Sequence, residues 1–384
     1  MRIGWIVPGF QGKADEPGIP ALTALASALS HSHDLHVYTV RFPPRDSAYL
    51  VDGVPVVSFG AAPEPGNRFH WRVASARRWL RVLSPIRDEH ARRPFDALHG
   101  FWATEPGMLA CVAGHLLGIP VTVSVCGGEL ASVRVAGYGN QLHRLERAQV
   151  GFSLQLAAAI GVGSDDSRSR VLSRFPWLAA KIRDLPLGFD PHTFALSATP
   201  PNSNTVVCVA SWSPVKGHPL LLDGFRLLAR RLPSARLILV GERTDGPEAR
   251  AAIAERGLTT MVQPLGYLRP RGVATVVAGA HASVITSWHE AECLAVVESL
   301  ASGTPIVATP VGIARQLLRN PALGALIPAR SPEAVFAALD SVLRTTADEV
   351  RQTRLARAAA VEYLAVERVA ERFAAHYQAI ADGR

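Results

Sequence analysis

Residues 284–312 read VITSWHEAECLAVVESLASGTPIVATPVG, and this stretch decides the fold class of the chain. It predicts a strand ending at Thr286, a polar turn, a helix, a Gly-Thr-Pro break and a second strand. Glu290 and Glu298 are separated by seven residues across the turn and the first helical turns. Open α/β sheets bind phosphorylated ligands where a strand leads into a helix N-terminus, so we expect such a site here, with Glu298 facing a ribose diol. An ordinary βαβ unit in which Glu298 is exposed to solvent is equally compatible with this sequence.

Length and composition predict two globular α/β domains. A chain of 384 residues is too long for one compact core. Its composition, with 48% hydrophobic and 19% charged residues, is that of a folded α/β protein and not of a disordered one. The N-terminus, MRIGWIVPGF, lacks the apolar core and cleavage site of a signal peptide, so it predicts a first strand. Four cysteines without CxxC spacing predict neither a zinc site nor a disulfide framework, and we expect a cytoplasmic location.

Strand and helix patterns alternate along both halves, which predicts parallel sheets covered on both faces. The expected strands lie at 3–7, 36–40, 54–59, 96–99, 121–125, 159–161, 206–210, 236–240 and 261–263. The expected helices lie at 20–29, 105–117, 142–156, 220–231 and 248–255.

A proline-rich stretch divides the two halves. Residues 186–204, PLGFDPHTFALSATPPNSN, follow neither a helical nor a strand period. We therefore predict an N-terminal domain at 1–188, a linker at 189–204, a C-terminal domain at 205–364, and a last helix at 365–384 that packs back across the hinge. The predicted fold is two doubly wound, Rossmann-like sheets that face each other across a cleft, with strand C-termini toward it.

The net charge of +8 is concentrated in residues 68–93. Two acidic residues and two tryptophans accompany eight arginines there: Arg68, Arg72, Arg77, Arg78, Arg81, Arg87, Arg92 and Arg93. A solvated helix face and a helix lying on an anionic membrane both fit this pattern, and both stay open. No nucleic-acid module accompanies the patch, so no nucleic-acid partner is expected.

The C-terminal half resembles the donor domain of a retaining GT-B glycosyltransferase of family 4, the glycosyl transferases group 1. In that family the 290–306 segment reads E-G-F-G-L-x-x-x-E-A-x-A-x-G-x-P-V. The identical positions here are Glu290, Leu294, Glu298, Ala301, Gly303 and Pro305.

Further motifs follow in the family's order. VASWSPVKGHPLLLDGF resembles its VGRL-x-x-x-KG loop and keeps Lys216-Gly217, and ILVGE and LGYL come after it. FDALHG, GIPVTVSVCGGEL and KIRDLPLGFDPHTF resemble the family's D-x-x-H, G-I-P-x-V-x-T-x-H-G-x-E and K-I-x-V-I-P-N-G-V-D stretches. The resemblance therefore spans nearly the whole chain.

The resemblance implies a retaining transferase that moves a sugar from a nucleotide-diphosphate sugar, expected to be a UDP- or GDP-sugar, to an acceptor hydroxyl. It also implies front-face attack, in which the departing phosphate accepts the proton of the acceptor. No cofactor or metal is then required, and the sequence has no DxD motif.

The resemblance also assigns the donor site. Lys216, one of only three lysines in the chain, neutralises the phosphates, Glu298 binds the ribose, and Glu290 contacts the reacting sugar. Gly266 and Tyr267 are expected near the base, and Gly18 lies in a loop at 9–18 that approaches the diphosphate. The remaining donor-side residues are Ser211 and Leu294.

The acceptor side departs from the family pattern. Cys126 stands where the family has the histidine of H-G-x-E, and it is followed by Gly127, Gly128 and Glu129. We expect Cys126 to be catalytic and the other three, with His99, to face the acceptor.

A second departure affects the phosphate site. Ser211 stands where the family has a phosphate-binding arginine, and Arg243 is a candidate replacement. Two alternatives therefore stay open: a catalytically silent GT-B protein that binds a nucleotide sugar or a partner, and a GT-B sugar-nucleotide epimerase.

Overall fold

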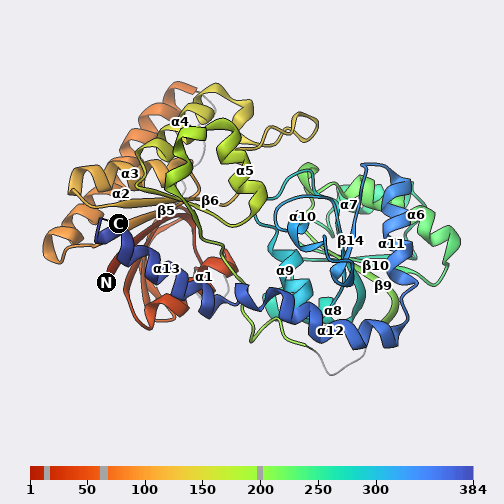
Figure 1. The fold of residues 1–384 in the computed structure, drawn as a ribbon. Coiled ribbons are helices and arrows are strands. Elements are labelled where there is room, and N and C mark those ends of the chain that lie inside the picture. Colours follow the sequence, from red (N-terminus) through yellow and green to blue (C-terminus); the bar gives the residue numbers. More distant parts are fainter. Residues whose placement is uncertain (13–17, 61–67, 197–201, 384) are drawn as a thin grey trace. The chain divides into compact units, whose positions relative to one another are not determined.

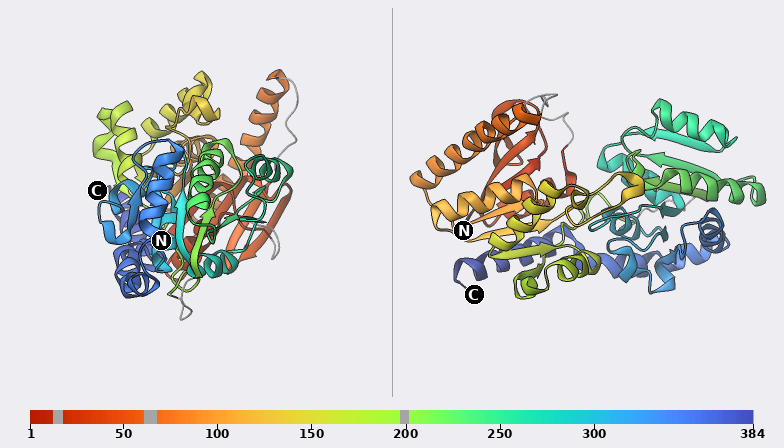
Figure 2. Two further views of the ribbon diagram at one scale, coloured as in Figure 1. Left: turned by 90° about the vertical axis from the view of Figure 1, so that its right-hand side faces the viewer. Right: turned by 90° about the horizontal axis from the view of Figure 1, so that it is seen from above.

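The computed structural model of the chain describes residues 1–12, 18–60, 68–196 and 202–383 (Figure 1). These residues form two compact units. The first unit comprises Met1–Leu130, Gly139–Gly188 and Val366–Arg384, and the second comprises Ala131–Tyr138 and Phe189–Ala365. Each unit is built on one twisted sheet of mostly parallel strands with helices on both faces, so the predicted pair of Rossmann-like domains is confirmed (Figure 2).

The sheet of the first unit has eight strands in the order β3-β4-β2-β1-β5-β6-β7-β8. Its central strands are buried on both faces, which explains their continuous apolar runs. The strands are β1 (Arg2–Gly9), β2 (Asp34–Phe42), β3 (Asp46–Val51), β4 (Val54–Phe59), β5 (Ala97–Phe101), β6 (Val121–Val125), β7 (Ala159–Val162) and β8 (Ile182–Asp184). The helices are α1 (Pro20–Ser30), α2 (Arg68–Arg92), α3 (Glu105–Leu117), α4 (Arg144–Leu156), α5 (Asp165–Arg174) and α13 (Val366–Ala381).

Strand β3 was not expected, and it is the antiparallel member of this sheet. It pairs with β4 through the two-residue turn Asp52-Gly53, in which both residues have positive φ values of 47° and 82°. Asp-Gly is a strong signal for this kind of hairpin turn. The strand lies at the edge of the sheet and alternates exposed with half-buried residues, so it lacks the apolar run that marks the central strands.

The sheet of the second unit has six parallel strands in the order β11-β10-β9-β12-β13-β14. These are β9 (Asn202–Val209), β10 (Arg236–Val240), β11 (Val262–Gly266), β12 (Ala280–Ile285), β13 (Ile306–Ala308) and β14 (Gly324–Leu326). The helices are α6 (His218–Arg231), α7 (Pro247–Glu255), α8 (Pro270–Gly279), α9 (Leu294–Ala301), α10 (Ala314–Leu317), α11 (Pro332–Leu343) and α12 (Ala347–Val361).

The strand order of the second unit reverses at one point. From β9 the chain proceeds outward through β10 and β11, and it then returns to the other side of β9 with β12, β13 and β14. The gap between the carboxyl ends of β9 and β12 is therefore the topological switch point, where open α/β sheets bind ligands.

The last helix, α13, belongs to the first unit (Figure 1). Buried polar contacts anchor it there. The Tyr377 hydroxyl accepts a hydrogen bond from Trp5 Nε1 at 2.9 Å and lies 2.7 Å from His99 Nδ1. His376 Nε2 lies 2.8 Å from the Thr122 hydroxyl. Because buried polar groups must be paired to be tolerated, these contacts hold α13 in one register on the sheet.

His99 is part of this core. Its side chain is fully buried, its Nε2 lies 2.9 Å from the Ser124 hydroxyl, and its ring stacks on Phe101 at 4.1 Å. Burial lowers the pKa of His99 well below its ordinary value. His99, which was expected to face the acceptor, therefore lies in the core of the first unit with no exposed surface.

Helix α2 makes up the basic stretch at 68–93 except for its last residue, Arg93. Four arginines of the stretch with described side chains make ion pairs: Arg81 with Asp46, Arg87 with Asp88, Arg92 with Glu89 and Arg93 with Asp34. The side chains of residues 68–78 lie outside the described part of the chain. Among the helices that are described, none is long and apolar enough to cross a bilayer.

His376 makes the first unit sensitive to acid. Burial lowers the pKa of His376 from 6.5 to about 4, and the charge of Arg183 adds to this effect. The unfolded chain therefore binds a proton that the folded chain does not, so stability is complete above about pH 6.5 and falls as the pH drops toward 4. We expect the loss to approach about 1.4 kcal/mol per pH unit from this group, and His376→Gln to remove that part of the slope. Urea unfolding at pH 7, 6 and 5 measures it.

The exposed His31 is the matched control, since His31→Gln changes a solvated histidine. Equal slopes for the native chain and His376→Gln would contradict the assignment.

Candidate functional site

The predicted donor residues Lys216 and Glu290 meet at the switch point of the second unit. Lys216 lies in the short 3₁₀ turn Pro214–Lys216 after β9, and Glu290 lies in the loop after β12. Because β9 and β12 are neighbours, their carboxyl ends bring both side chains to one edge of the sheet. Lys216 Nζ donates to Glu290 Oε1 at 2.7 Å, and the Ser287 hydroxyl donates to the same oxygen at 2.6 Å.

Backbone contacts hold these two loops together. The Thr286 hydroxyl donates to the carbonyl oxygens of Lys216 and Gly217, both at 3.1 Å, and the Trp288 N–H donates to the Val215 carbonyl at 2.7 Å. Gly217 has a φ of 71°, and a Cβ atom there would collide with the Thr286 carbonyl. Only glycine suits both the left-handed backbone and this close approach.

Lys216 keeps its charge in this setting. Burial by itself lowers the pKa of Lys216, but the charge and hydrogen bond of Glu290 outweigh it, and the pKa is raised overall. The site therefore holds a fixed ammonium group at the carboxyl edge of the sheet. Such a group is suited to bind an oxyanion.

Glu298 lies in α9. No side chain or backbone group in the described parts of the chain donates to its carboxylate, and burial raises the pKa of Glu298 to about 7. Burial also raises the pKa of the Cys293 thiol well above its ordinary value, and the charges of Glu290 and Glu298 add to that effect. The two glutamates therefore lie around the same buried residue, and Glu298 offers an unoccupied acceptor for hydroxyl groups.

The helix that follows Glu290 begins later than expected. We predicted a polar turn that leads directly into a helix N-terminus near Glu290, but α9 starts at Leu294. Cys293 before it has a φ of 70°, and the Glu292 carbonyl accepts from the Ile313 N–H at 2.9 Å. The loop after β12 is thus a defined turn held by the segment after β13, and it delays the helix by one turn.

Four other predicted donor residues lie along the same edge of the sheet. Ser211 follows β9 and is half-buried, and Leu294 is the first residue of α9. Gly266 ends β11 with a φ of 72°, and Tyr267 after it is 46% exposed. Because β10 separates β11 from β9, Gly266 and Tyr267 lie at the opposite side of the site from Glu290.

Two arginines near this edge behave differently. Arg243, the candidate replacement for a phosphate arginine, pairs with Glu248 at 2.9 Å, and both side chains are 67% exposed. Arg330, which the sequence did not single out among thirty-seven arginines, follows β14. Its Nη1 donates to the Thr286 carbonyl at 3.2 Å, and its guanidinium stacks on Trp288 at 3.8 Å.

In the first unit, Glu129 holds the turn that contains Cys126. The Glu129 carboxylate is fully buried and accepts from the backbone N–H groups of Ala103, Cys126 and Gly127 at 3.2, 3.0 and 2.7 Å. Burial raises the pKa of Glu129 although these donors oppose the shift. Glu129 therefore shapes the turn, while Cys126, Gly127 and Gly128 are half-buried at the carboxyl edge after β6.

Gly18 closes the loop that follows β1. A Cβ atom at Gly18 would collide with the backbone of Gln11, so the close approach requires glycine. Residues 13–17 of the predicted loop at 9–18 lie outside the described residues.

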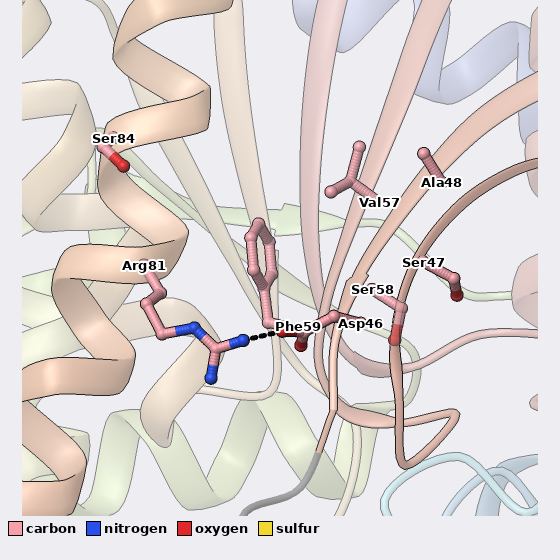
Figure 3. Close-up of a pocket in the computed structure, with 8 residues that line it drawn as sticks. All are labelled: Asp46, Ser47, Ala48, Val57, Ser58, Phe59, Arg81 and Ser84. Carbon is pink, nitrogen blue, oxygen red and sulfur yellow. Dashed lines mark hydrogen bonds and ion pairs between the residues drawn. The ribbon is translucent and has the colours of Figure 1, made fainter.

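A cavity of about 440 Å³ lies beside β3, β4 and α2 of the first unit (Figure 3). It is lined by Asp46, Ser47, Ala48, Val57, Ser58, Phe59, Arg81 and Ser84, and none of them is a predicted site residue. Across the described ranges, no cluster of three or more His, Cys, Asp or Glu residues is placed to hold a metal ion.

Comparison with protein families explains this geometry. Residues 192–360 match the model of the glycosyl transferases group 1, and residues 19–188 match a glycosyl transferase 4-like domain. Together with the two parallel sheets, these matches define a glycosyltransferase of the GT-B fold. The chain belongs to the glycosyl transferases group 1, with an N-terminal domain of the 4-like type.

Curated relatives match most of the chain. The phosphatidyl-myo-inositol mannosyltransferase of Mycobacterium tuberculosis is 28% identical over 362 residues, 92% of this chain and 90% of the relative. The D-inositol 3-phosphate glycosyltransferase of Mycobacterium leprae is 28% identical over 310 residues, 73% of this chain and 68% of the relative.

Solved structures share the fold at low identity. The sucrose-phosphate synthase of Thermosynechococcus elongatus superposes with a TM-score of 0.78 at 18% identity and covers 100% of both chains. Anabaena HepE in complex with UDP and glucose superposes with a TM-score of 0.73 at 17% identity and covers 99% of this chain and 100% of that chain.

The contact between Gly217 and Thr286 can be tested by alanine substitution. Gly257 is the matched control, because its φ of 69° is also left-handed but its surroundings are open. We expect Gly257→Ala to lower the free energy of unfolding by about 1 kcal/mol. Gly217→Ala adds a collision with the Thr286 carbonyl and should cost about 2 kcal/mol more. Denaturant unfolding of the two variants measures the difference, and equal losses would contradict the close packing of the two loops.

Proposed function

We propose that this glycosyltransferase is a retaining, metal-independent enzyme that moves a sugar from a nucleoside-diphosphate sugar to an acceptor hydroxyl. The observation that carries the proposal is the Lys216–Glu290 ion pair at the switch point, with the nearby carboxylate of Glu298, to which no described residue donates a hydrogen bond. One cation and two hydrogen-bond acceptors at that edge match a ligand in which a diphosphate joins two groups that carry hydroxyls.

Each residue has a role in this proposal. Lys216 binds the diphosphate, Glu298 accepts hydrogen bonds from the ribose hydroxyls, and Glu290 accepts one from the transferred sugar. Gly266 and Tyr267 contact the base, Ser211 and Leu294 line the donor, and Gly18 approaches the diphosphate. Cys126 contacts the reacting sugar or the acceptor, with Gly127 and Gly128 beside it.

The proposed reaction proceeds on one face of the sugar. The acceptor oxygen bonds to the anomeric carbon while the bond from that carbon to the diphosphate oxygen breaks. The electron pair stays on the diphosphate, and a diphosphate oxygen takes the proton of the acceptor. The protein's main task is then to stabilise the charge on the leaving group, and no protein nucleophile, cofactor or metal is needed.

The names of similar proteins support the choice of ligands to test. HepE was solved with UDP and glucose and with UDP-glucose, which supports a UDP-sugar donor. The mannosyltransferases among the relatives support mannose as a second sugar to test. GDP is the alternative nucleotide. Two relatives are named for inositol carrying a phosphate group, so we propose a phosphorylated polyol as the first acceptor class to screen.

The proposed donor site predicts selective stabilisation by one nucleoside diphosphate. A thermal-shift panel with UDP, GDP, ADP and dTDP, with and without magnesium, should reveal one stabiliser that is indifferent to the metal. At 100 times its dissociation constant that ligand adds about 2.7 kcal/mol. Glu298→Ala should weaken its binding by about 1–3 kcal/mol, the scale of hydrogen bonds to a charged group.

Glu255, 74% exposed on α7, is the matched control, and Glu255→Ala should bind like the native chain. Unchanged affinity in folded Glu298→Ala would remove the ribose assignment. No stabilisation by any of the four nucleotides would favour the catalytically silent alternative, to which the departures at Cys126 and Ser211 point.

We also propose a cytoplasmic location, with residues 68–93 contacting an anionic membrane surface. The support is the concentration of arginines in α2. Flotation with anionic vesicles at physiological salt checks it, and an Arg87→Glu/Arg92→Glu variant should float less. Recovery of the native chain only at the bottom of the gradient would identify α2 as a solvated helix.

A further inference from the structure

The charges assigned so far do not balance a diphosphate. The positive charge of Lys216 is matched by Glu290 at 2.7 Å, and Glu298, with a pKa of about 7, adds up to one negative charge. Ser211 in the loop after β9 is neutral. A bound diphosphate brings at least two further negative charges, so these four residues alone leave it uncompensated in a partly buried site.

Arg330 lies beside this site through the strand order. Strands β12, β13 and β14 are neighbours, so the residues after β14 reach the same carboxyl edge as the loop after β12. The Arg330 guanidinium donates to the carbonyl oxygens of Thr286 and Ser287. Thr286 binds the Lys216-Gly217 backbone and Ser287 binds Glu290. Arg330 is therefore connected to each partner of the ion pair through one intervening residue.

No carboxylate among the described residues compensates the charge of Arg330. It forms no ion pair with any carboxylate in the described portion of the chain, and its guanidinium is half-buried against Trp288 at 3.8 Å. A partly desolvated cation without a counter-ion is unfavourable unless an anion joins it. Two of its five N–H donors face the two carbonyls, so the guanidinium keeps donors for phosphate oxygens.

We propose that Arg330 binds the diphosphate of the donor and supplies the second positive charge of the site. The inference rests on the proposed function and deepens it by naming a residue that recognises the diphosphate itself. As the sugar–oxygen bond breaks, negative charge grows on the leaving diphosphate, and Arg330 stabilises that charge together with Lys216.

A purely structural role for Arg330 makes a different prediction. If the guanidinium only holds the Thr286–Trp288 loop, its loss weakens every ligand of the site, including those without phosphate. If it binds the diphosphate, its loss weakens only ligands that carry phosphate. Arg243 is the matched control, because it follows the neighbouring strand β10 but is ion-paired and 67% exposed.

The experiment compares Arg330→Ala, Arg330→Lys and Arg243→Ala with the native chain. Titration calorimetry, with competition for weak ligands, measures binding of inorganic pyrophosphate, of the stabilising nucleoside diphosphate and of its nucleoside. We expect Arg330→Ala to bind pyrophosphate and the nucleoside diphosphate at least about tenfold more weakly, with nucleoside affinity unchanged. Arg330→Lys should fall between, since it keeps the charge but loses the fork. Arg243→Ala should match the native chain.

Two results would overturn the inference while the proposed function stands: unchanged diphosphate affinity in Arg330→Ala, or an equal loss for nucleoside and diphosphate. Arg330→Lys keeps the test valid if Arg330→Ala does not fold. If Arg330→Lys still binds pyrophosphate in preference to the nucleoside, a charge contact is supported. If it loses affinity for pyrophosphate and for the nucleoside to the same extent, the inference is contradicted. If the native chain binds neither pyrophosphate nor any nucleotide, the proposed function itself fails.

Discussion

The ion pair between Lys216 and Glu290 depends on the adjacency of β9 and β12, and the site of the second unit is arranged around it. The two residues are separated by seventy-four positions in sequence and come together because the strand order reverses between their strands. Their loops carry small polar residues, Thr286 and Ser287, which bond one loop to the other's backbone and to the glutamate. Solved structures at 17–18% identity share the fold on which this adjacency depends.

The chain holds its last two helices by buried polar contacts in different units. Helix α12 lies on the second unit, where Arg354 and Arg357 donate to the carbonyls of Ser302 and Gly303 at the end of α9, both at 3.3 Å. These donors satisfy carbonyl groups that a helix end leaves open. Helix α13 lies on the first unit, where Tyr377 joins Trp5 and His99. Polar anchors of this kind fix a helix register more strictly than apolar contacts alone.

The sequence predicted central elements well and edges poorly, for a physical reason. The observed bounds match the prediction for the strands at 121–125 and 236–240 and for the helix at 105–117. Buried parallel strands are continuous apolar runs, and the helices between them end at glycine or a charged residue, so both kinds of element are visible in the sequence. The edge strand β3 lacks such a run and is signalled only by Asp52-Gly53. Side-chain partners over long sequence distances were not predictable: nothing local marks His99 as buried or selects Arg330 from thirty-seven arginines.

The geometry also bears on how the proposed donor enters without breaking the ion pair. Lys216 has three N–H donors and uses one on Glu290, so two remain for phosphate oxygens. Glu290 Oε1 also accepts from Ser287, so that oxygen stays paired if the ammonium turns toward the ligand. Glu298 has no donor to give up among the described residues, and ligand hydroxyl groups that donate to its carboxylate favour the ionised form, against the burial that raises its pKa to about 7. The site is therefore arranged to add ligand bonds rather than to exchange them, and this limits the reorganisation that binding requires.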